Sequence, residues 1–214
     1  MSYKIDDVDK FSKEVTTMQT TSTFSPVADK IQTFSVDLNG GYAFSWLSGF
    51  NDATGYDGAL RSSYQVGIGI NVPINGNWGI ETGVGYLALA GNSYSYYDLF
   101  YKVTGNIDLS YVEVPLLVKY DFLKNLNIKN GTSVGLKTGL QVGFNTQATD
   151  HGDSYSNDFD AKTNLDWVFG VFGYIGHSGV SINFNYGLTD VVKSSENSNN
   201  FRNKGVAVLY SYRF

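Results

Sequence analysis

YVEVPLLVKY, residues Tyr111 to Tyr120, is the stretch that decides the fold. In an extended strand, successive side chains point to opposite faces. One face of this stretch is wholly apolar and consists of Val112, Val114, Leu116, Val118 and Tyr120. The other face carries the charges of Glu113 and Lys119. One strand with two such different faces needs an apolar environment on one side and a polar one on the other, which predicts a transmembrane β-strand between lipid and a polar lumen.

The same alternation recurs along most of the chain. Expected strands lie at residues 34–46, 64–74, 78–90, 111–120, 134–144, 165–175, 180–188 and 206–214. Long connections at 48–60, 91–106, 147–162 and 190–203 alternate with shorter ones, of which Asn75-Gly76-Asn77 is a tight hairpin turn. This asymmetry is typical of an up-and-down barrel. The predicted fold class is therefore all-β: an eight-stranded antiparallel up-and-down transmembrane β-barrel with short turns on one side and long loops on the other.

Residues 1–32 form a separate polar segment before the expected barrel of residues 33–214. The segment is rich in serine and threonine, and a few of its apolar residues are three or four positions apart. This spacing leaves two alternatives open, a short helix or a disordered tail. No apolar signal-peptide core follows Met1, so an exported protein would correspond to a mature or engineered form of the sequence.

The composition narrows the classes of function. The 214 residues contain 20 acidic and 15 basic side chains, and the net charge of −5 disfavours nucleic acid as a partner. The absence of cysteine excludes disulfides, zinc–thiolate sites and thiol chemistry. No apolar run approaches the roughly 18 residues of a transmembrane helix.

Side-chain volume and charge favour an outward apolar face. An eight-stranded barrel leaves an interior just wide enough for side chains, and the apolar set is too bulky for that space. The rival is a soluble ligand-binding barrel with its apolar face inside. In the transmembrane arrangement the charged side chains point inward, and these are Asp37, Glu81, Glu113, Lys119, Lys137, Asp166 and Arg213.

The inward charges have two alternative roles. Asp37 and Arg213 are on the first and last strands, which become neighbours when the barrel closes, and Glu81 and Lys119 are on adjacent strands. Paired charges could form a structural plug. They could also line a narrow, selective pore.

Two of the long loops are candidate binding sites. One contains an aromatic cluster that could contact a protein or a glycan, or could extend the strands and pack on itself. Its residues are Tyr94, Tyr96, Tyr97, Phe100 and Tyr101. The carboxylates between Thr149 and Asp160 could hold calcium, but their spacing does not fit an EF-hand, and a solvated acidic loop is the alternative.

Catalysis has little support in the sequence. The histidines, His151 and His177, lie in connections at opposite ends of the expected barrel, and neither has an evident nucleophile and orienting carboxylate. No phosphate-binding glycine motif appears. We expect neither enzymatic activity nor a cofactor.

YVEVPLLVKY also resembles the strand motif of the outer-membrane β-barrel domain of Bacteroidota, the PorT-like proteins. The matching positions are Tyr111, Glu113, Pro115, Leu116, Leu117, Lys119 and Tyr120. FNYGLTDV, which begins at Phe184, and the closing LYSYRF are similar to the last two strands of that family. The terminal Phe214 with its alternating tyrosines is also similar to the signal that the barrel assembly machinery reads.

The resemblance implies a location and limits the roles. It implies the outer membrane of a Gram-negative bacterium, with outer-membrane lipid and the assembly machinery as partners. Our first hypothesis is a non-enzymatic membrane anchor or interaction module that acts through its extracellular loops. The alternative is a narrow channel or a secretion-accessory component, because the resemblance implies such a role for some members.

Overall fold

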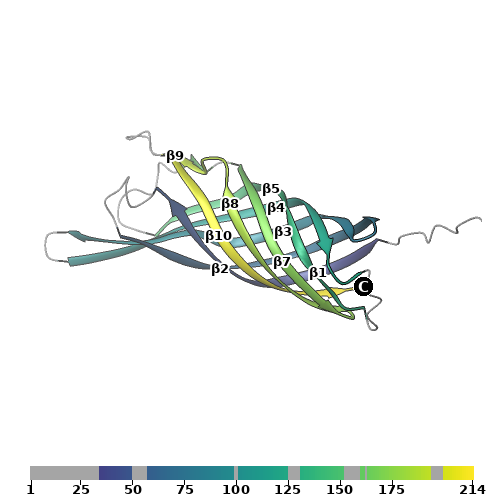
Figure 1. Ribbon diagram of the computed structural model, residues 1–214. Coiled ribbons are helices and arrows are strands. Elements are labelled where there is room, and N and C mark those ends of the chain that lie inside the picture. Colours follow the sequence, from purple (N-terminus) through teal and green to yellow (C-terminus); the bar gives the residue numbers. More distant parts are fainter. Residues whose placement is uncertain are drawn as a thin grey trace, which may run out of the picture. The chain divides into compact units, whose positions relative to one another are not determined.

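The computed structural model describes residues 34–49, 57–98, 101–124, 131–151, 160–161, 163–193 and 200–214 (Figure 1). The expected segment 1–32 lies outside these ranges. Among the described residues, no helix has the length and apolar character that crossing a membrane requires. The described residues from Phe34 onward are almost all in β-strands.

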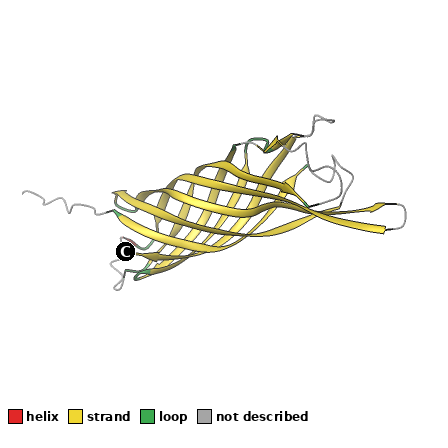
Figure 2. Cartoon of the chain, turned by 180° about the vertical axis from the view of Figure 1, so that it is seen from behind, coloured by secondary structure: helices red, strands yellow, loops and turns green. Residues whose placement is uncertain are grey.

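Eight long antiparallel strands form a closed ring, which confirms the predicted fold class. They are β1 (Ser35–Ser48), β2 (Asp57–Asn75), β3 (Trp78–Asp98), β4 (Tyr101–Asp121), β5 (Ser133–Asp150), β7 (Asn164–Ile175), β8 (Ser178–Gly187) and β10 (Asn200–Arg213). Each strand pairs with the next long strand in the chain, and β10 returns to pair with β1. The strands cross the barrel at a steep tilt (Figure 2).

Two very short strands form additional pairings at the long-loop end of the barrel. β6 (Asp160–Ala161) pairs with β9 (Val192–Lys193), and β9 pairs with the start of β10. The connection between β8 and β10, expected as a simple polar loop, therefore contributes a strand to a small accessory sheet.

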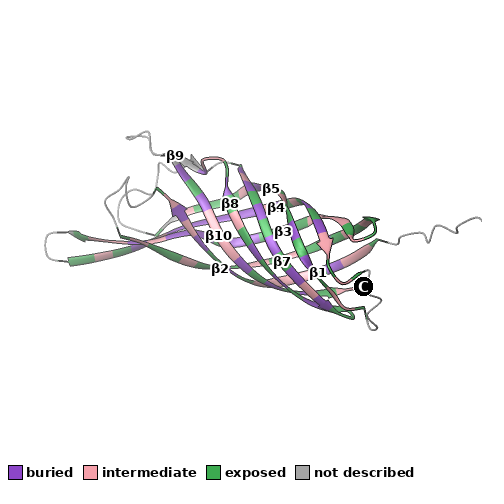
Figure 3. Ribbon diagram, in the orientation of Figure 1, coloured by how far each residue is buried: buried purple, intermediate pink, exposed green. Residues whose placement is uncertain are grey.

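The outward face is apolar along every long strand. Exposed and buried positions alternate around the barrel (Figure 3). Exposed side chains on four of the strands include Leu38, Ile68, Leu116 and Val180. The soluble alternative is therefore wrong, because it requires these side chains to be inside. Their apolar belt has the character that a bilayer interior demands.

A β-bulge changes the face of β3 partway along the strand. The register between β3 and β4 shifts between Leu87 and Ala90, and Leu89 has a positive φ of 58°. Continuous alternation through the expected strand 78–90 places Ala90 on the same outward face as Trp78 and Val84. That prediction is wrong, since Ala90 is 0% exposed. A bulge inserts an extra residue on one strand, so the period-two pattern restarts on the opposite face.

The long loops are shorter than predicted because strands continue into them. Residues 91–106 were expected as a loop, but β3 runs to Asp98 and β4 begins at Tyr101. Likewise, β2 begins within the expected loop 48–60, and β5 continues to Asp150. The β3–β4 hairpin is the longest extension, and it projects well past the barrel (Figure 1).

Candidate functional site

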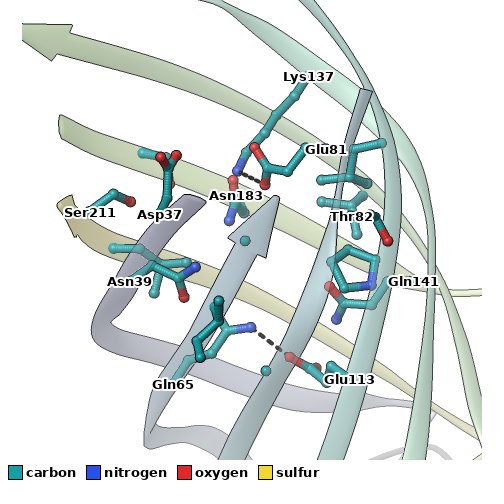
Figure 4. A pocket seen from close by; sticks show the side chains of 18 of the residues that line it. Asp37, Asn39, Gln65, Glu81, Thr82, Glu113, Lys137, Gln141, Asn183 and Ser211 are labelled. Carbon is teal, nitrogen blue, oxygen red and sulfur yellow. Dashed lines mark hydrogen bonds and ion pairs between the residues drawn. The ribbon is translucent and has the colours of Figure 1, made fainter. Parts of the chain in front are cut away.

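A three-residue ion cluster occupies the lumen near the short-turn end. The two oxygens of the Glu81 carboxylate accept hydrogen bonds from Lys119 Nζ and Lys137 Nζ, each at 2.9 Å. β4 and β5 bring the two lysines together, because Lys119 and Lys137 are register partners. Figure 4 shows Lys137 and Glu81 pointing toward each other across the lumen. One carboxylate thus serves two buried cations.

The barrel seam holds the second pair of predicted charges. Arg213 Nε donates to Asp37 Oδ1 at 2.9 Å, and Arg213 Nη2 donates to Asp37 Oδ2 at 3.1 Å. The hydroxyl of Tyr174 and the amide of Asn71 also donate to Asp37, at 2.7 Å and 2.8 Å. Since Asn71 accepts a hydrogen bond from Lys119 at 2.6 Å, the seam and the ion cluster form one network.

The remaining two predicted residues, Glu113 and Asp166, lie deeper in the lumen and away from that network. Each is 2% exposed. Glu113 accepts a hydrogen bond from Gln65 Nε2 at 2.5 Å, and Asp166 accepts one from Asn164 Nδ2 at 2.8 Å. Within the described ranges, no salt bridge joins either carboxylate to a basic side chain.

A small cavity of about 50 Å³ lies between these two groups of charges. Glu81 and Lys137 line it on one side, and Glu113 and Gln141 line it on the other (Figure 4). A buried site needs roughly 10–15 Å³ of such space for each water, so the cavity has room for a few waters or an ion.

Apolar side chains fill the lumen toward the long-loop end. This set, which we call the outer apolar cluster, consists of Ala43, Leu47, Leu87, Ala90, Tyr94, Ile107, Leu109, Tyr111, Val191, Phe201, Ala207 and Leu209. The prediction that bulky apolar side chains lie outside the barrel is incomplete, because large apolar side chains pack inside this half. Among the described residues, the small central cavity therefore lies between a charged network at one end and apolar packing at the other.

Sequence reasoning missed a charged group at the outer rim. Arg61 donates to both oxygens of Asp108, at 2.7 Å and 3.0 Å, and His151 Nε2 lies 3.4 Å from Asp108 Oδ2. Arg61 and Asp108 lie just beyond the predicted ends of their strands, next to expected loops. Ser63 points into the lumen, and side chains two positions apart on a strand share a face. The same alternation, continued from Ser63 to Arg61, would have placed Arg61 in the lumen.

The histidines do not form a catalytic group among the described residues. His177 lies in the β7–β8 turn, where its Nδ1 is 2.6 Å from the carbonyl oxygen of Arg213. Its ring stacks on Tyr212. No group of three or more His, Asp or Glu side chains in the described ranges is arranged as a metal site. Most of the acidic loop from Thr149 to Asp160, the predicted calcium candidate, lies outside the described residues.

Some residues of the predicted aromatic cluster in the β3–β4 hairpin are packed against the barrel, and others are exposed. Tyr94 is 7% exposed and belongs to the outer apolar cluster, and Tyr96 packs against that cluster. Tyr97 and Tyr101, near the hairpin tip, are each 77% exposed. Phe100 lies outside the described residues. The alternative in which these residues pack on the barrel therefore applies to Tyr94 and Tyr96, and Tyr97 and Tyr101 are accessible to a partner.

Comparisons with known proteins agree with this architecture. The sequence model of the family described as "Outer membrane protein beta-barrel domain" matches residues 19–193. Among solved structures, the chain is similar to the outer membrane protein OprG from Pseudomonas aeruginosa, with 12% identity and a TM-score of 0.52 over 86% of this chain and 97% of that chain. At this identity the likeness shows the fold alone.

Two further solved structures are similar at lower TM-scores. Ail, the attachment invasion locus protein of Yersinia pestis, is 14% identical over 84% of this chain and 98% of its own, with a TM-score of 0.42. Neisserial surface protein A is 13% identical over 85% of this chain and 97% of its own, with a TM-score of 0.44. The comparison with curated proteins gave no match. Because the family match covers most of its length, this chain belongs to the outer membrane protein β-barrel domain family and is a small barrel of the bacterial outer membrane.

Proposed function

We propose that the protein is a non-enzymatic interaction module of the outer membrane, in which the barrel is an anchor and the β3–β4 hairpin is the contact surface. The projecting hairpin carries this proposal. Its strands are 21 residues each, and they continue past the rim of the barrel (Figure 1).

The base of the hairpin is built as a rigid support. Gly91 N–H donates to Ser45 Oγ at 2.8 Å, which ties β3 to β1. Farther out, the ring of Tyr94 occupies the place that a side chain at residue 105 would need, and Gly105 leaves that place open. Packing of this kind holds an extended ribbon in one position. A pre-positioned ribbon loses less conformational entropy when it binds a partner.

The tip presents aromatic side chains to the exterior. Tyr97 and Tyr101 combine a large apolar ring with a hydroxyl, and residues of this kind are enriched at protein interfaces. The proposed partner is a protein or a glycan at the cell surface. The filled lumen supports an anchor rather than a route through the membrane.

Site-specific photo-cross-linking in intact outer membranes tests the proposal. A photoreactive amino acid replaces Tyr97 or Tyr101, and Tyr42 is the matched control because it is 73% exposed but lies on the outward face of β1. We expect defined protein or glycan adducts at residues 97 and 101, and lipid adducts alone at residue 42. The same lipid adducts at all three positions would refute the hairpin as a contact surface.

Catalysis is excluded from the proposal because the described residues offer no assembled machinery. His151 contacts Asp108 on one side, and Arg61 engages the same carboxylate. No hydrogen bond in the described part of the chain links this histidine ring to a serine or threonine nucleophile.

A narrow channel or a secretion-accessory component is the second candidate. The PorT-like motif in β4 favours it, and a source in the Bacteroidota is part of the same proposal. We also propose outer-membrane lipid as the partner of the apolar belt, and the barrel assembly machinery as the reader of the last strand, where Tyr210, Tyr212 and Phe214 are exposed.

A further inference from the structure

The pair Glu113 and Asp166 is electrically unbalanced in a buried environment. Both side chains are almost fully buried, and their charges repel each other. The nearest group of basic side chains, Lys119 and Lys137, is bound to Glu81. Burying carboxylates without a neutralising partner is strongly unfavourable, so either bound protons or a bound cation balances these two side chains.

The surrounding side chains leave oxygen atoms free for such a species. Asp166 Oδ1 and Asn164 Oδ1 are both buried and have no hydrogen-bond partner among the described residues. Asn164 Nδ2 donates to the other oxygen of Asp166, so the hydrogen bond fixes which oxygens remain open. Asn164 is 2% exposed, so its side chain has almost no contact with bulk solvent.

The strand registers place two of these residues in the same part of the lumen. Glu113 on β4, Gly143 on β5 and Asn164 on β7 occupy one row across the three strands. Gly143 has no side chain, so no side chain of β5 separates Glu113 from Asn164 in this row. The ring of Tyr111 lies 3.4 Å from where a Cβ on Gly143 would be, and its hydroxyl interacts electrostatically with both carboxylates.

We propose that Glu113, Asp166 and Asn164 bind a divalent cation of the calcium class inside the lumen. Calcium prefers carboxylate, amide and water oxygens and accepts irregular geometry. Two carboxylates match its charge. The cavity of about 50 Å³ beside Glu113 supplies space for the waters that complete the coordination. A transition metal such as zinc is disfavoured because the group contains no imidazole or thiolate.

The proposal is tested by the metal content of the refolded full-length barrel. The protein is refolded into detergent micelles in the presence of calcium chloride, dialysed against a calcium-free buffer, and analysed by inductively coupled plasma mass spectrometry. We expect about one calcium ion per chain, retained over magnesium because magnesium demands near-ideal octahedral geometry. Wild-type protein without retained calcium would overturn the proposal and leave protons as the neutralising species.

Three variants locate the site. Glu113→Gln and Asp166→Asn keep the shape of each side chain and remove one charge, and we expect both to lose most of the bound calcium. Asp190→Asn is the matched control, because Asp190 pairs with Arg202 at the outer rim. Folding of each variant is checked by the heat-dependent shift of its gel mobility. If folded Glu113→Gln and Asp166→Asn retain as much calcium as Asp190→Asn, the assignment to this pair is wrong.

Discussion

At the scale of single residues, Glu81 is the centre of the charged network. It neutralises Lys119 and Lys137 together, and all three side chains are largely buried. Removing the Glu81 carboxylate leaves the ammonium groups of Lys119 and Lys137 buried without a counter-charge. Removing one lysine leaves Glu81 paired with the other lysine. The two kinds of substitution therefore have unequal costs.

We predict that Glu81→Gln destabilises the barrel by about 3 kcal/mol or more, the usual cost of breaking a buried ion pair from one side. Lys137→Gln should cost about 1.5 kcal/mol, because one charged hydrogen bond is lost and the Glu81–Lys119 pair remains. Urea unfolding in micelles, followed by tryptophan fluorescence, measures both free energies of unfolding. A larger loss for Lys137→Gln than for Glu81→Gln would contradict the shared-partner arrangement.

Some residue contacts could be predicted from the sequence and others could not. The contact between Asp37 and Arg213 follows from closure, because the first and last strands of a barrel must pair. Lys137 joins Glu81 from β5, which is two strands away from β3. Contacts of that kind depend on the tilt and stagger of the strands. These two quantities determine which residues of non-adjacent strands face each other across the lumen. Alternation alone does not contain this information.

At the scale of elements, the bulge in β3 determines how the hairpin leaves the barrel. Gly91 follows the bulge with a φ of +130°. A Cβ at this position would overlap the carbonyl oxygen of Ile107 on β4. Ser45 on β1 also hydrogen-bonds to both the N–H and the carbonyl oxygen of Gly91. The hairpin therefore depends on glycine here.

We predict that Gly91→Ala destabilises the protein by about 1–3 kcal/mol from backbone strain, with a further loss from the steric overlap. Gly76→Ala is the matched control, since Gly76 also has a positive φ, +50°, but nothing lies within 4 Å of a Cβ there. It should cost about 1 kcal/mol. Chemical denaturation of both variants provides the comparison, and equal losses would show that the close packing around Gly91 contributes nothing.

The bulge also explains where strand prediction failed. Alternation in period two predicted each of the eight strands, because each has one lipid-facing side and one lumen-facing side. An inserted residue reverses the pattern, so Ala90 was placed on the wrong face. Beyond the membrane there is no lipid to enforce alternation. The serines and tyrosines of the hairpin, Ser93 to Tyr97, consequently looked like a loop.

At the scale of the whole molecule, the lumen is filled from both ends. The charged network occupies the short-turn half, and the outer apolar cluster occupies the long-loop half. The cavity between them is too small to be a continuous path for hydrated ions. Side-chain volumes in the sequence predicted a narrow interior, but not the outer apolar cluster. Three of its residues, Tyr94, Val191 and Phe201, come from segments that were expected to be loops.

We predict that the refolded barrel produces no discrete conductance steps in a planar bilayer. Lys119→Ala combined with Lys137→Ala should remain silent as well, because the outer apolar cluster still closes the other half. Protection of the barrel from protease in the same membranes shows that it has inserted. Discrete steps whose size or selectivity changes in the lysine variant would establish the channel alternative instead.

The seam between β1 and β10 also has a consequence for biogenesis. Asp37 is near the start of the described chain, and its Arg213 partner is 176 residues later. During synthesis, every copy carries this aspartate for the whole time before its counter-charge exists. An unfinished copy would hold this carboxylate by the hydrogen bonds from Tyr174 and Asn71 alone, without the charge that balances it. The seam is therefore electrically complete only when the last strand is present.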